Sequence, residues 1–361
     1  MVRRIAFLLA LVLTTGPVRT RAAGATEKPR LVVGIVIDQF RYDYLERFGD
    51  LFDKGGFRRL MQEGAVFTDA QYLHSQTVTS VGHTTFMTGS IPSYTGIIAN
   101  EWYERTEGKI VRSVADDTVQ TVGSASGRPS SPRRLVGSTL GDELKISNAG
   151  ASRVVGVSIK DAPAILTTGH HPDGAYWFDP ASGRFITSTY YMKQLPVWVE
   201  QFNAKKIPAK FLGREWTKLR PEPDYARSGI DDSPYERPPG GHRVFPHPVD
   251  NYDQFMESPF SKDALEAFAK AAIEGENLGG HKDSDLLIPK PYWVVSDKTT
   301  GHGTPYSFDT NVPVIFWGTW FAPGRYVREA SPADIAPTLA SILRITRPSG
   351  AVGRVLAEAP R

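Results

Sequence analysis

A continuous apolar run near the start of the chain constrains the fold most. Residues 31–37, LVVGIVI, are rich in β-branched side chains, which predicts a strand buried on both faces of a parallel sheet. The run ends at Asp38, and the carboxyl edge of such a sheet is where α/β proteins place ligands and catalytic groups. Asp38 is therefore a candidate site residue. Similar runs predict further strands at 153–159, 175–178, 292–295 and 312–317.

Helical patterns lie between these runs. Apolar residues recur at helical spacing over 262–274, and Ser261 is expected to cap that helix. The sequence Ser331-Pro332-Ala333-Asp334 supplies an N-cap, a proline at the first helical position and an acid in the first turn, so a second helix is predicted from there to about Leu343. Alternating strands and helices predict an α/β sandwich with a mainly parallel central sheet flanked by helices.

Two polar stretches interrupt this alternation. Residues 104–134 have the composition of a surface excursion, and residues 205–260, dense in Pro, Tyr, Arg and Asp, that of an irregular, lid-like insertion. The 361 residues contain no internal repeat, so we expect a single domain over 26–361 rather than two independent ones.

The first 25 residues read as a signal peptide. Arg3 and Arg4 precede an apolar segment at 5–13 that is too short to span a bilayer, and we predict cleavage after Ala25. An uncleaved membrane anchor is the alternative. Removing the four arginines of this segment from the 42 basic residues leaves 38 against 39 acidic ones, a net charge of −1, which argues against nucleic-acid binding. A periplasmic or secreted protein is expected, with no transmembrane span after cleavage.

The chain has no cysteine, so a cysteine nucleophile and thiolate metal ligands are excluded. Thr79 stands before a Gly-containing helical segment, where free backbone N–H groups and the helix dipole would stabilise an anion and favour attack on a phosphate. Asn100 could donate to a phosphoryl oxygen. A threonine that only caps a helix is the plainer interpretation of Thr79.

Six separated segments carry a resemblance to a known family: VIDQFRYDYL, TVTSVGHTTFMTG, GIIANEWY, VSIKDAPAIL, HGTPYSFDTNVPVIFWG and ASPADIAPTLASIL. In this order and spacing, over about 31–287 and 289–357, the chain resembles the secreted alkaline phosphatases of the phosphate-irrepressible type. These belong to the alkaline phosphatase superfamily, beside the type I phosphodiesterases and nucleotide pyrophosphatases. The resemblance implies an alkaline-phosphatase-like sandwich and a two-zinc hydrolase that forms a phospho-threonine intermediate.

The resemblance also implies roles for particular residues. Asp38 matches a ligand of one zinc ion, and His302 matches a ligand of the other. Thr79 matches the nucleophile that bridges the two ions. Asn100 matches the asparagine that holds a phosphoryl oxygen, and Lys160 the lysine that contacts the phosphate.

The sequence departs from the family pattern in its phosphate-binding tripeptide. Phosphomonoesterases of this type carry Lys-Asp-Arg, whereas this chain has Lys160-Asp161-Ala162. Ala162 cannot supply the bidentate grip of an arginine on a phosphate. Because a dianionic monoester depends more on that grip than a diester does, we expect any activity to favour diesters.

A larger departure follows Leu287, where the sequence passes to a segment that resembles a region far downstream in the family. The resemblance places a deletion junction at about 287–289, and four of the six zinc ligands would lie in the missing part. A catalytic zinc ion normally needs about three protein ligands. Other zinc ligands would have to come from the junction or the insertion, where the residues with metal-compatible side chains are His242, His247, His281, Asp283 and Asp285. His170 and His171 are interpreted as structural residues.

The sequence therefore supports three readings. The first is a zinc-dependent phosphoric-ester hydrolase that acts on small-molecule phosphoesters. The second is a catalytically impaired relative that binds phosphate or phosphoesters without turnover. The third is a truncated gene product, since an in-frame join in a gene model would leave the same pattern. A monomer is the simplest expectation.

Overall fold

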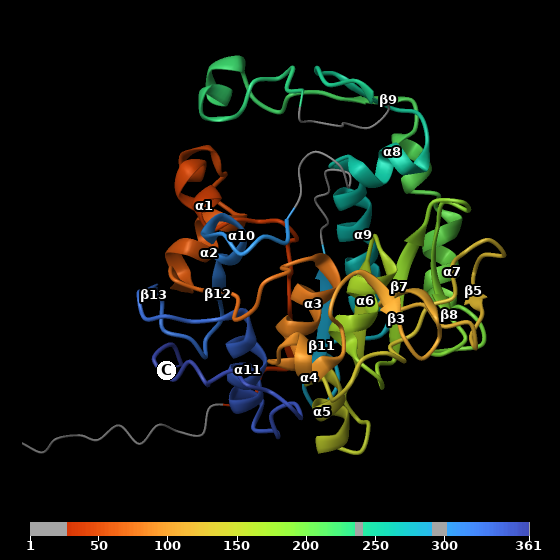
Figure 1. Ribbon diagram of the computed structural model, residues 1–361, viewed down its shortest axis with the longest axis vertical. Helices are drawn as coiled ribbons and strands as arrows, with labels where there is room; N and C mark the ends of the chain where they lie inside the picture. Colours follow the sequence, from red (N-terminus) through yellow and green to blue (C-terminus); the bar gives the residue numbers. More distant parts are fainter. Residues whose placement is uncertain (1–26, 235–240, 291–301, 361) are drawn as a thin grey trace, which may run out of the picture.

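A six-stranded mixed sheet forms the centre of the molecule. The computed structural model describes residues 27–234, 241–290 and 302–360, and Figure 1 shows this sheet enclosed by helices. Its order is β1-β11-β6-β7-β8-β5; the first four strands run parallel, and β8 and β5 pair antiparallel. The strands are β1 (Leu31–Val33), β11 (Asp285–Lys290), β6 (Val154–Ser158), β7 (Gly174–Asp179), β8 (Arg184–Ser188) and β5 (Thr121–Val122).

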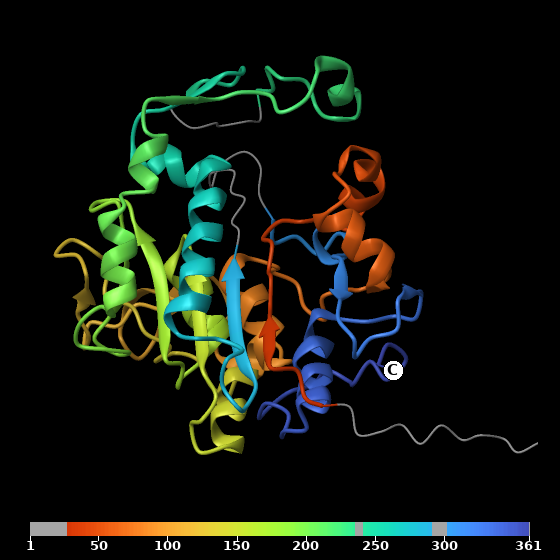
Figure 2. The same cartoon turned by 180° about the vertical axis from the view of Figure 1, so that it is seen from behind.

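Helices cover both faces of this sheet, as the views from the two sides show (Figures 1 and 2). On one face, the aromatic side chains of two helices pack against β6, β7 and β8, with Phe268 stacked on Phe185 at 3.9 Å between ring centroids. On the other face, helices pack through Met87 and Ile165. The helices of the first face are α7 (Val197–Ala204) and α9 (Phe260–Gly275); those of the second are α3 (Thr79–Thr88), α5 (Leu140–Ser147), α6 (Asp161–Thr168) and α11 (Ile335–Leu343).

A smaller three-stranded sheet stands beside the central one. Its order is β12-β2-β13, with β12 antiparallel and β13 parallel to β2. Short helices surround it. The strands are β2 (Ala65–Phe67), β12 (Val314–Phe316) and β13 (Gly324–Tyr326), and the helices are α1 (Asp43–Arg47), η1 (Gly49–Leu51), α2 (Gly56–Glu63), α10 (Ser307–Thr310) and η5 (Pro332–Asp334).

The predicted strands are confirmed at 153–159 and 175–178, and the prediction for 31–37 needs correction. Strand β1 ends at Val33, so the five residues from Gly34 to Asp38 are not strand. Among the described residues β1 pairs only with β11, and the side chain of Val33 is 44% exposed. An edge strand has no second neighbour to hold its end in register, which explains why it is short. The run 312–317 forms β12 of the smaller sheet, and 292–295 lies outside the described residues.

Both predicted helices are present, but only one begins as expected. Ser331 caps the short 3-10 helix η5 that leads into α11: its hydroxyl accepts the N–H of Ala333, and Asp334 accepts the N–H of Ser331. Ser261 does not cap the other helix. Because α9 begins at Phe260, two residues earlier than predicted, Ser261 lies inside it and donates its hydroxyl to the carbonyls of Met256 and Ser258.

Residues 104–134, predicted as a surface excursion, are largely exposed at 105–110 but also contain regular structure and buried residues. They include β5, which extends the central sheet, and β4 (Lys109–Arg112), which pairs with β3 (Glu101–Glu104). Asp116 and Ser131 within this stretch are buried and hydrogen-bonded to each other. Buried polar pairs of this kind attach part of the stretch to the fold, while its other polar residues are exposed. The short helix α4 (Pro92–Thr95) precedes the hairpin.

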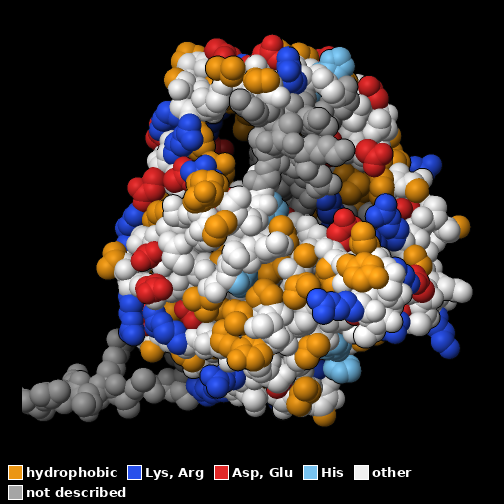
Figure 3. Space-filling view, in the orientation of Figure 1, with side chains coloured by type: hydrophobic (Ala, Val, Ile, Leu, Met, Phe, Trp, Pro, Cys, Tyr) orange, Lys and Arg blue, Asp and Glu red, His pale blue; other side chains and the backbone are white. Residues whose placement is uncertain are grey.

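The predicted insertion at 205–260 includes a strap, defined here as residues 212–234 and 241–249, that crosses beyond the carboxyl ends of the parallel strands (Figures 1 and 2). Arg227 pairs with Asp50 at 2.8 Å, and Arg47 donates to the carbonyl of Arg227, so the strap contacts the α1–η1 segment. An opening remains beneath it (Figure 3). The insertion contains η2 (Pro208–Phe211), β9 (Arg214–Trp216), η3 (Glu222–Arg227), β10 (His247–Val249) and α8 (Tyr252–Glu257).

No helix in the described ranges is both long enough and apolar enough to cross a membrane. The predicted signal peptide, residues 1–25, lies outside those ranges. The predicted junction at 287–289 falls within β11, which runs unbroken from Asp285 to Lys290 between β1 and β6.

Candidate active site

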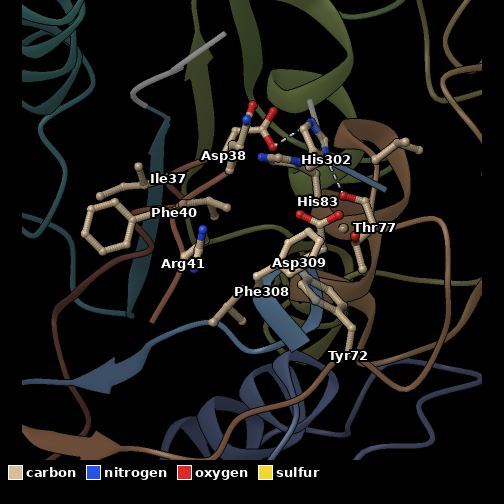
Figure 4. Close-up of a pocket in the computed structure, with 15 residues that line it drawn as sticks. Ile37, Asp38, Phe40, Arg41, Tyr72, Thr77, His83, His302, Phe308 and Asp309 are labelled. Atoms are coloured by element: carbon tan, nitrogen blue, oxygen red, sulfur yellow. Dashed lines mark hydrogen bonds and ion pairs between the residues drawn. The ribbon is translucent and has the colours of Figure 1, made fainter. Parts of the chain in front are cut away.

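Three of the predicted site residues meet beside the first turn of α3. Val78 is extended and Thr79 begins the helix, which leaves the Thr79 hydroxyl at the helix N-terminus. This hydroxyl donates to Asp38 Oδ2 at 2.8 Å, and both side chains are buried. His302 Nε2 lies 3.4 Å from Asp38 Oδ1, as Figure 4 shows. A carboxylate between a hydroxyl and an imidazole can accept a proton from the hydroxyl.

The imidazole of His302 is oriented by the chain segment that leads into α3. Its Nδ1 contacts the carbonyl oxygen of Thr77, two residues before Thr79 (Figure 4). A carbonyl only accepts, so Nδ1 donates, and Nε2 is the atom presented to Asp38. Residues that lie 225 positions apart in the sequence are thereby held against the same turn.

A small cavity of about 50 Å³ adjoins the cluster of Asp38, Thr79 and His302. Asp38, His302, His83, Tyr72 and Asp309 line it (Figure 4). Burial raises the pKa of the Tyr72 phenol, and the negative charge of Asp38 raises it further. The phenol therefore stays protonated at neutral pH and adds no negative charge beside Asp38.

Asn100 and Lys160 lie on a much larger cleft in front of the cluster. The cleft has a volume of about 1030 Å³, and Thr79 and His302 also line it. Asn100 Oδ1 accepts the N–H of Ser80 at 2.8 Å, which leaves the amide Nδ2 as the group that can donate to a ligand. Lys160 is the N-cap residue of α6, so it lines the cleft at the point where a second helix begins. The structure thus brings all five predicted positions to one place.

A polar network fixes the β3–β4 hairpin to α3. Ser113, directly after β4, places its hydroxyl 2.8 Å from that of Ser80 and donates its N–H to the carbonyl of Asn100. The residue before it, Arg112, lines the cleft and forms an ion pair with Asp161. Sequence reasoning missed Arg112, because a lone basic residue in a polar stretch carries no motif.

The environment of Asp161 keeps it ionised. Burial alone would raise its pKa, but the charge and hydrogen bond of Arg112, with further hydrogen bonds from Ser130 and the Ala162 N–H, hold the pKa below its usual value. The Arg112–Asp161 pair is therefore charged on both sides in the neutral pH range.

The described residues do not fit a two-zinc centre. They contain no group of three or more His, Asp or Glu side chains placed to hold a metal ion, and Asp38 and His302 give one carboxylate and one imidazole. Two catalytic ions need about three protein ligands each. The proposed substitutes lie apart from this cluster in other surroundings: Asp285 is fully buried and bonded to His281, and the ring of His247 packs against Trp216 and Phe245.

The other residues considered as possible metal ligands, or as structural histidines, do not form a metal site either. The N–H groups of His170 and His171 both donate to Asp142 Oδ1 at 2.8 Å, after the end of α6. His242 and Asp283 belong to no metal-ligating group of the described residues.

Comparisons with known proteins agree on one family. The family model described as type I phosphodiesterase / nucleotide pyrophosphatase matches residues 32–322. Alkaline phosphatase PafA of Elizabethkingia meningoseptica is 38% identical over 291 residues, 78% of this chain and 53% of that protein. Alkaline phosphatase PhoV of Synechococcus elongatus is 42% identical over 268 residues, 72% of this chain and 49% of that protein. The chain thus spans about half the length of these curated relatives.

The fold agrees with the sequence matches. The crystal structure of wild-type alkaline phosphatase PafA aligns with a TM-score of 0.87 and 26% identity, covering 93% of this chain and 100% of that one. The predicted α/β fold with a central sheet between helices is confirmed. The matched segments, the family model and this structural agreement show that the chain belongs to the type I phosphodiesterase / nucleotide pyrophosphatase family, within the alkaline phosphatase superfamily.

Proposed function

We propose that this chain hydrolyses small-molecule phosphoric esters with Thr79 as the nucleophile. One observation carries the proposal: the Thr79 hydroxyl lies at the N-terminus of α3 and donates to Asp38, on a cleft that Asn100 and Lys160 also line. A helix N-terminus, an amide donor and an ammonium group together form a site for an anion such as a phosphoryl group. The names of the relatives, alkaline phosphatases, support the same reaction class.

The chemistry follows from the hydrogen bond between Thr79 and Asp38. Asp38 takes the hydroxyl proton while Thr79 Oγ1 bonds to phosphorus, the bond from phosphorus to the leaving oxygen breaks, and the proton passes to the leaving group. Water then attacks the phosphothreonine, releases the phosphate and returns a proton to Thr79. The N–H groups of α3, Asn100 and Lys160 stabilise the negative charge on the phosphoryl oxygens.

If the reaction depends on zinc, Asp38 and His302 are the two described residues at matching ligand positions that would hold the metal. A zinc ion bound there would supply positive charge at the attacking oxygen. The described donor set is too small for two ions, so the steps above rely on the side chains alone. The preference for diesters is likewise proposed, because Ala162 offers no cation to a dianionic monoester.

Turnover by the purified chain tests the proposal. Hydrolysis of a chromogenic phosphate monoester and diester should be measured for wild type and Thr79→Ala, each with added zinc and with a chelator. We expect wild-type turnover that Thr79→Ala reduces to background, since the alanine has no nucleophilic oxygen. Wild-type turnover no faster than that of Thr79→Ala would end the proposal for this chain.

The small donor set favours a second candidate, a protein that binds phosphate or phosphoesters without turnover. Thr79→Ser offers a matched control, since serine keeps the hydroxyl. For the binding protein, calorimetry should detect phosphate binding in chelated buffer, with no hydrolysis by wild type or Thr79→Ser. Two tightly held zinc ions per chain in elemental analysis would contradict this candidate.

The location of the protein and its domain organisation are proposed from the sequence. We infer a periplasmic or secreted protein from the signal peptide predicted at 1–25, and a single domain over 26–361 with an internal deletion at about 287–289. The chain spans 53% and 49% of these two relatives, which is compatible with a missing part. Genomic DNA read across the codons for Leu287 to Pro289 in an independent isolate distinguishes a true deletion from a faulty gene model.

A further inference from the structure

Arg112 stands at the end of β4 and lines the cleft. In the antiparallel β3–β4 pair, Arg112 lies opposite Glu101, the residue that follows Asn100. Facing residues in such a pair are about 5 Å apart, so Arg112 and Asn100 occupy the same end of the hairpin. Both line the same cleft as Thr79.

Two contacts fix this end of the hairpin relative to the nucleophile. Ser113, the next residue, touches the hydroxyl of Ser80 in the first turn of α3 and donates its N–H to the carbonyl of Asn100. The backbone of Arg112 is therefore one residue from a direct contact with the helix that begins at Thr79.

The side chain of Arg112 reaches the start of α6. Its Nη2 donates to Asp161, which stands between Lys160 and Ala162, and the Arg112 side chain is 29% exposed. Asp161 is held in turn by the hydroxyl of Ser130. A guanidinium group has five N–H donors in a planar fork, so the ion pair through Nη2 leaves donors for a second anion.

We propose that Arg112 is a specificity-determining residue whose guanidinium group binds the substrate phosphate in the cleft, supplying a cation that position 162 lacks. This rests on the proposed function, because it names the residue that holds the phosphate of that same site. Asp161 fixes the guanidinium group and offsets part of its charge. Arg112 therefore attracts a dianion less strongly than an unpaired arginine would, which is compatible with the proposed preference for diesters.

Two substitutions with opposite expected effects test this role. Arg112→Gln removes the cation, and we expect the Kd for inorganic phosphate to rise about tenfold, the loss of one charge-assisted hydrogen bond. Arg112→Lys should recover part of the affinity. Asp161→Asn leaves the guanidinium group without its counter-charge, so the Kd should fall. Calorimetric titration with inorganic phosphate measures each value.

Arg134 offers a matched control. It forms a comparable ion pair with Glu107 at 2.6 Å, and it does not line the cleft, so Arg134→Gln should bind phosphate as wild type does. If Arg112 only supports the fold, Arg112→Gln and Asp161→Asn will both lower the melting temperature, and the Kd for phosphate will not rise in the first variant and fall in the second. That result, with wild-type phosphate binding intact, would overturn the role of Arg112.

The same titration separates this inference from the proposed function. Wild type that binds phosphate with an affinity independent of position 112 contradicts the inference alone. Wild type that neither binds phosphate nor hydrolyses an ester contradicts the proposed function, and the role of Arg112 with it.

Discussion

At the scale of single residues, Ala162 is the position where one side chain should change substrate preference. It lies in the first turn of α6 and lines the cleft beside Lys160 and Asp161. We expect Ala162→Arg to raise kcat/KM for a phosphate monoester about tenfold relative to a diester, because a bidentate guanidinium contact stabilises the dianion more. Steady-state kinetics on the two chromogenic esters give this ratio.

Ala162→Gln is the control for that change, since glutamine adds a long polar side chain without charge. Its monoester-to-diester ratio should stay near that of wild type. An equal rise in both variants would mean that side-chain bulk, and not charge, sets the preference.

How far single residues could be predicted depends on how local their signals are. Asp38, Thr79 and His302 were expected at one site, and the structure places them in contact with one another. Each belongs to a segment with its own recognisable pattern. Arg112 has no such segment, because its position follows from the pairing of β4 with β3 and from the Ser80–Ser113 contact.

At the scale of elements, a substitution can test whether the Ser331 cap stabilises η5, the short helix that leads into α11. The Ser331 hydroxyl accepts the N–H of Ala333, and the N–H of Ser331 is accepted by Asp334, in a buried turn. We expect Ser331→Ala to lower the free energy of unfolding by about 1 kcal/mol, because one helix N–H group loses its acceptor. Urea unfolding measures this change.

Ser341, which is exposed on α11, the helix that follows η5, is the matched control. Ser341→Ala should change the free energy of unfolding by less than about 0.5 kcal/mol. Equal effects of the two alanines would show that the Ser331 cap contributes nothing of its own.

The two serine caps show what sequence patterns can predict about elements. Ser331 comes with a proline and an acid at fixed offsets, and these three residues specify the turn together. Ser261 stood alone, and α9 began at Phe260 because Phe260 packs against the fold through its stack on Phe211. Packing thus decides a helix boundary where local capping signals are weak.

At the scale of the whole molecule, the strap depends on exposed charge pairs for its contact with the α1–η1 segment. Asp50 and Arg227 form one of them at 2.8 Å. We expect Asp50→Lys to speed chymotrypsin cleavage near Leu219 and Tyr225 about two- to fivefold, because the new charge repels Arg227 and favours local opening. Gel analysis of a digestion time course measures the rate.

The double variant Asp50→Lys with Arg227→Glu restores opposite charges and should return cleavage to the wild-type rate. Glu266→Lys, which disturbs the exposed pair with Lys270 on α9, is the control and should leave cleavage of the strap unchanged. If all three behave like wild type, the ion pair does not hold the strap.

The overall class of the fold was predictable, and the course of the strap was not. Apolar runs and helical periodicity depend on burial, which sequence patterns report directly. The strap contacts the rest of the molecule through charges such as those of Arg220 and Arg227, and charged residues occur equally on free surfaces. Only the three-dimensional arrangement shows which of them meet.

The place of β1 at the sheet edge has a consequence for how this fold changes in size. No other described strand pairs with β1 on its far side, and Val33, its last residue, is 44% exposed. Another strand could hydrogen-bond to this edge without moving β11 or β6, so the sheet can gain or lose strands while the turn at Thr79 keeps its surroundings. A chain that spans about half the length of its relatives can in this way keep the contact between Thr79 and Asp38 and the cleft beside it, and the same edge can pair with strands of neighbouring molecules in a concentrated solution.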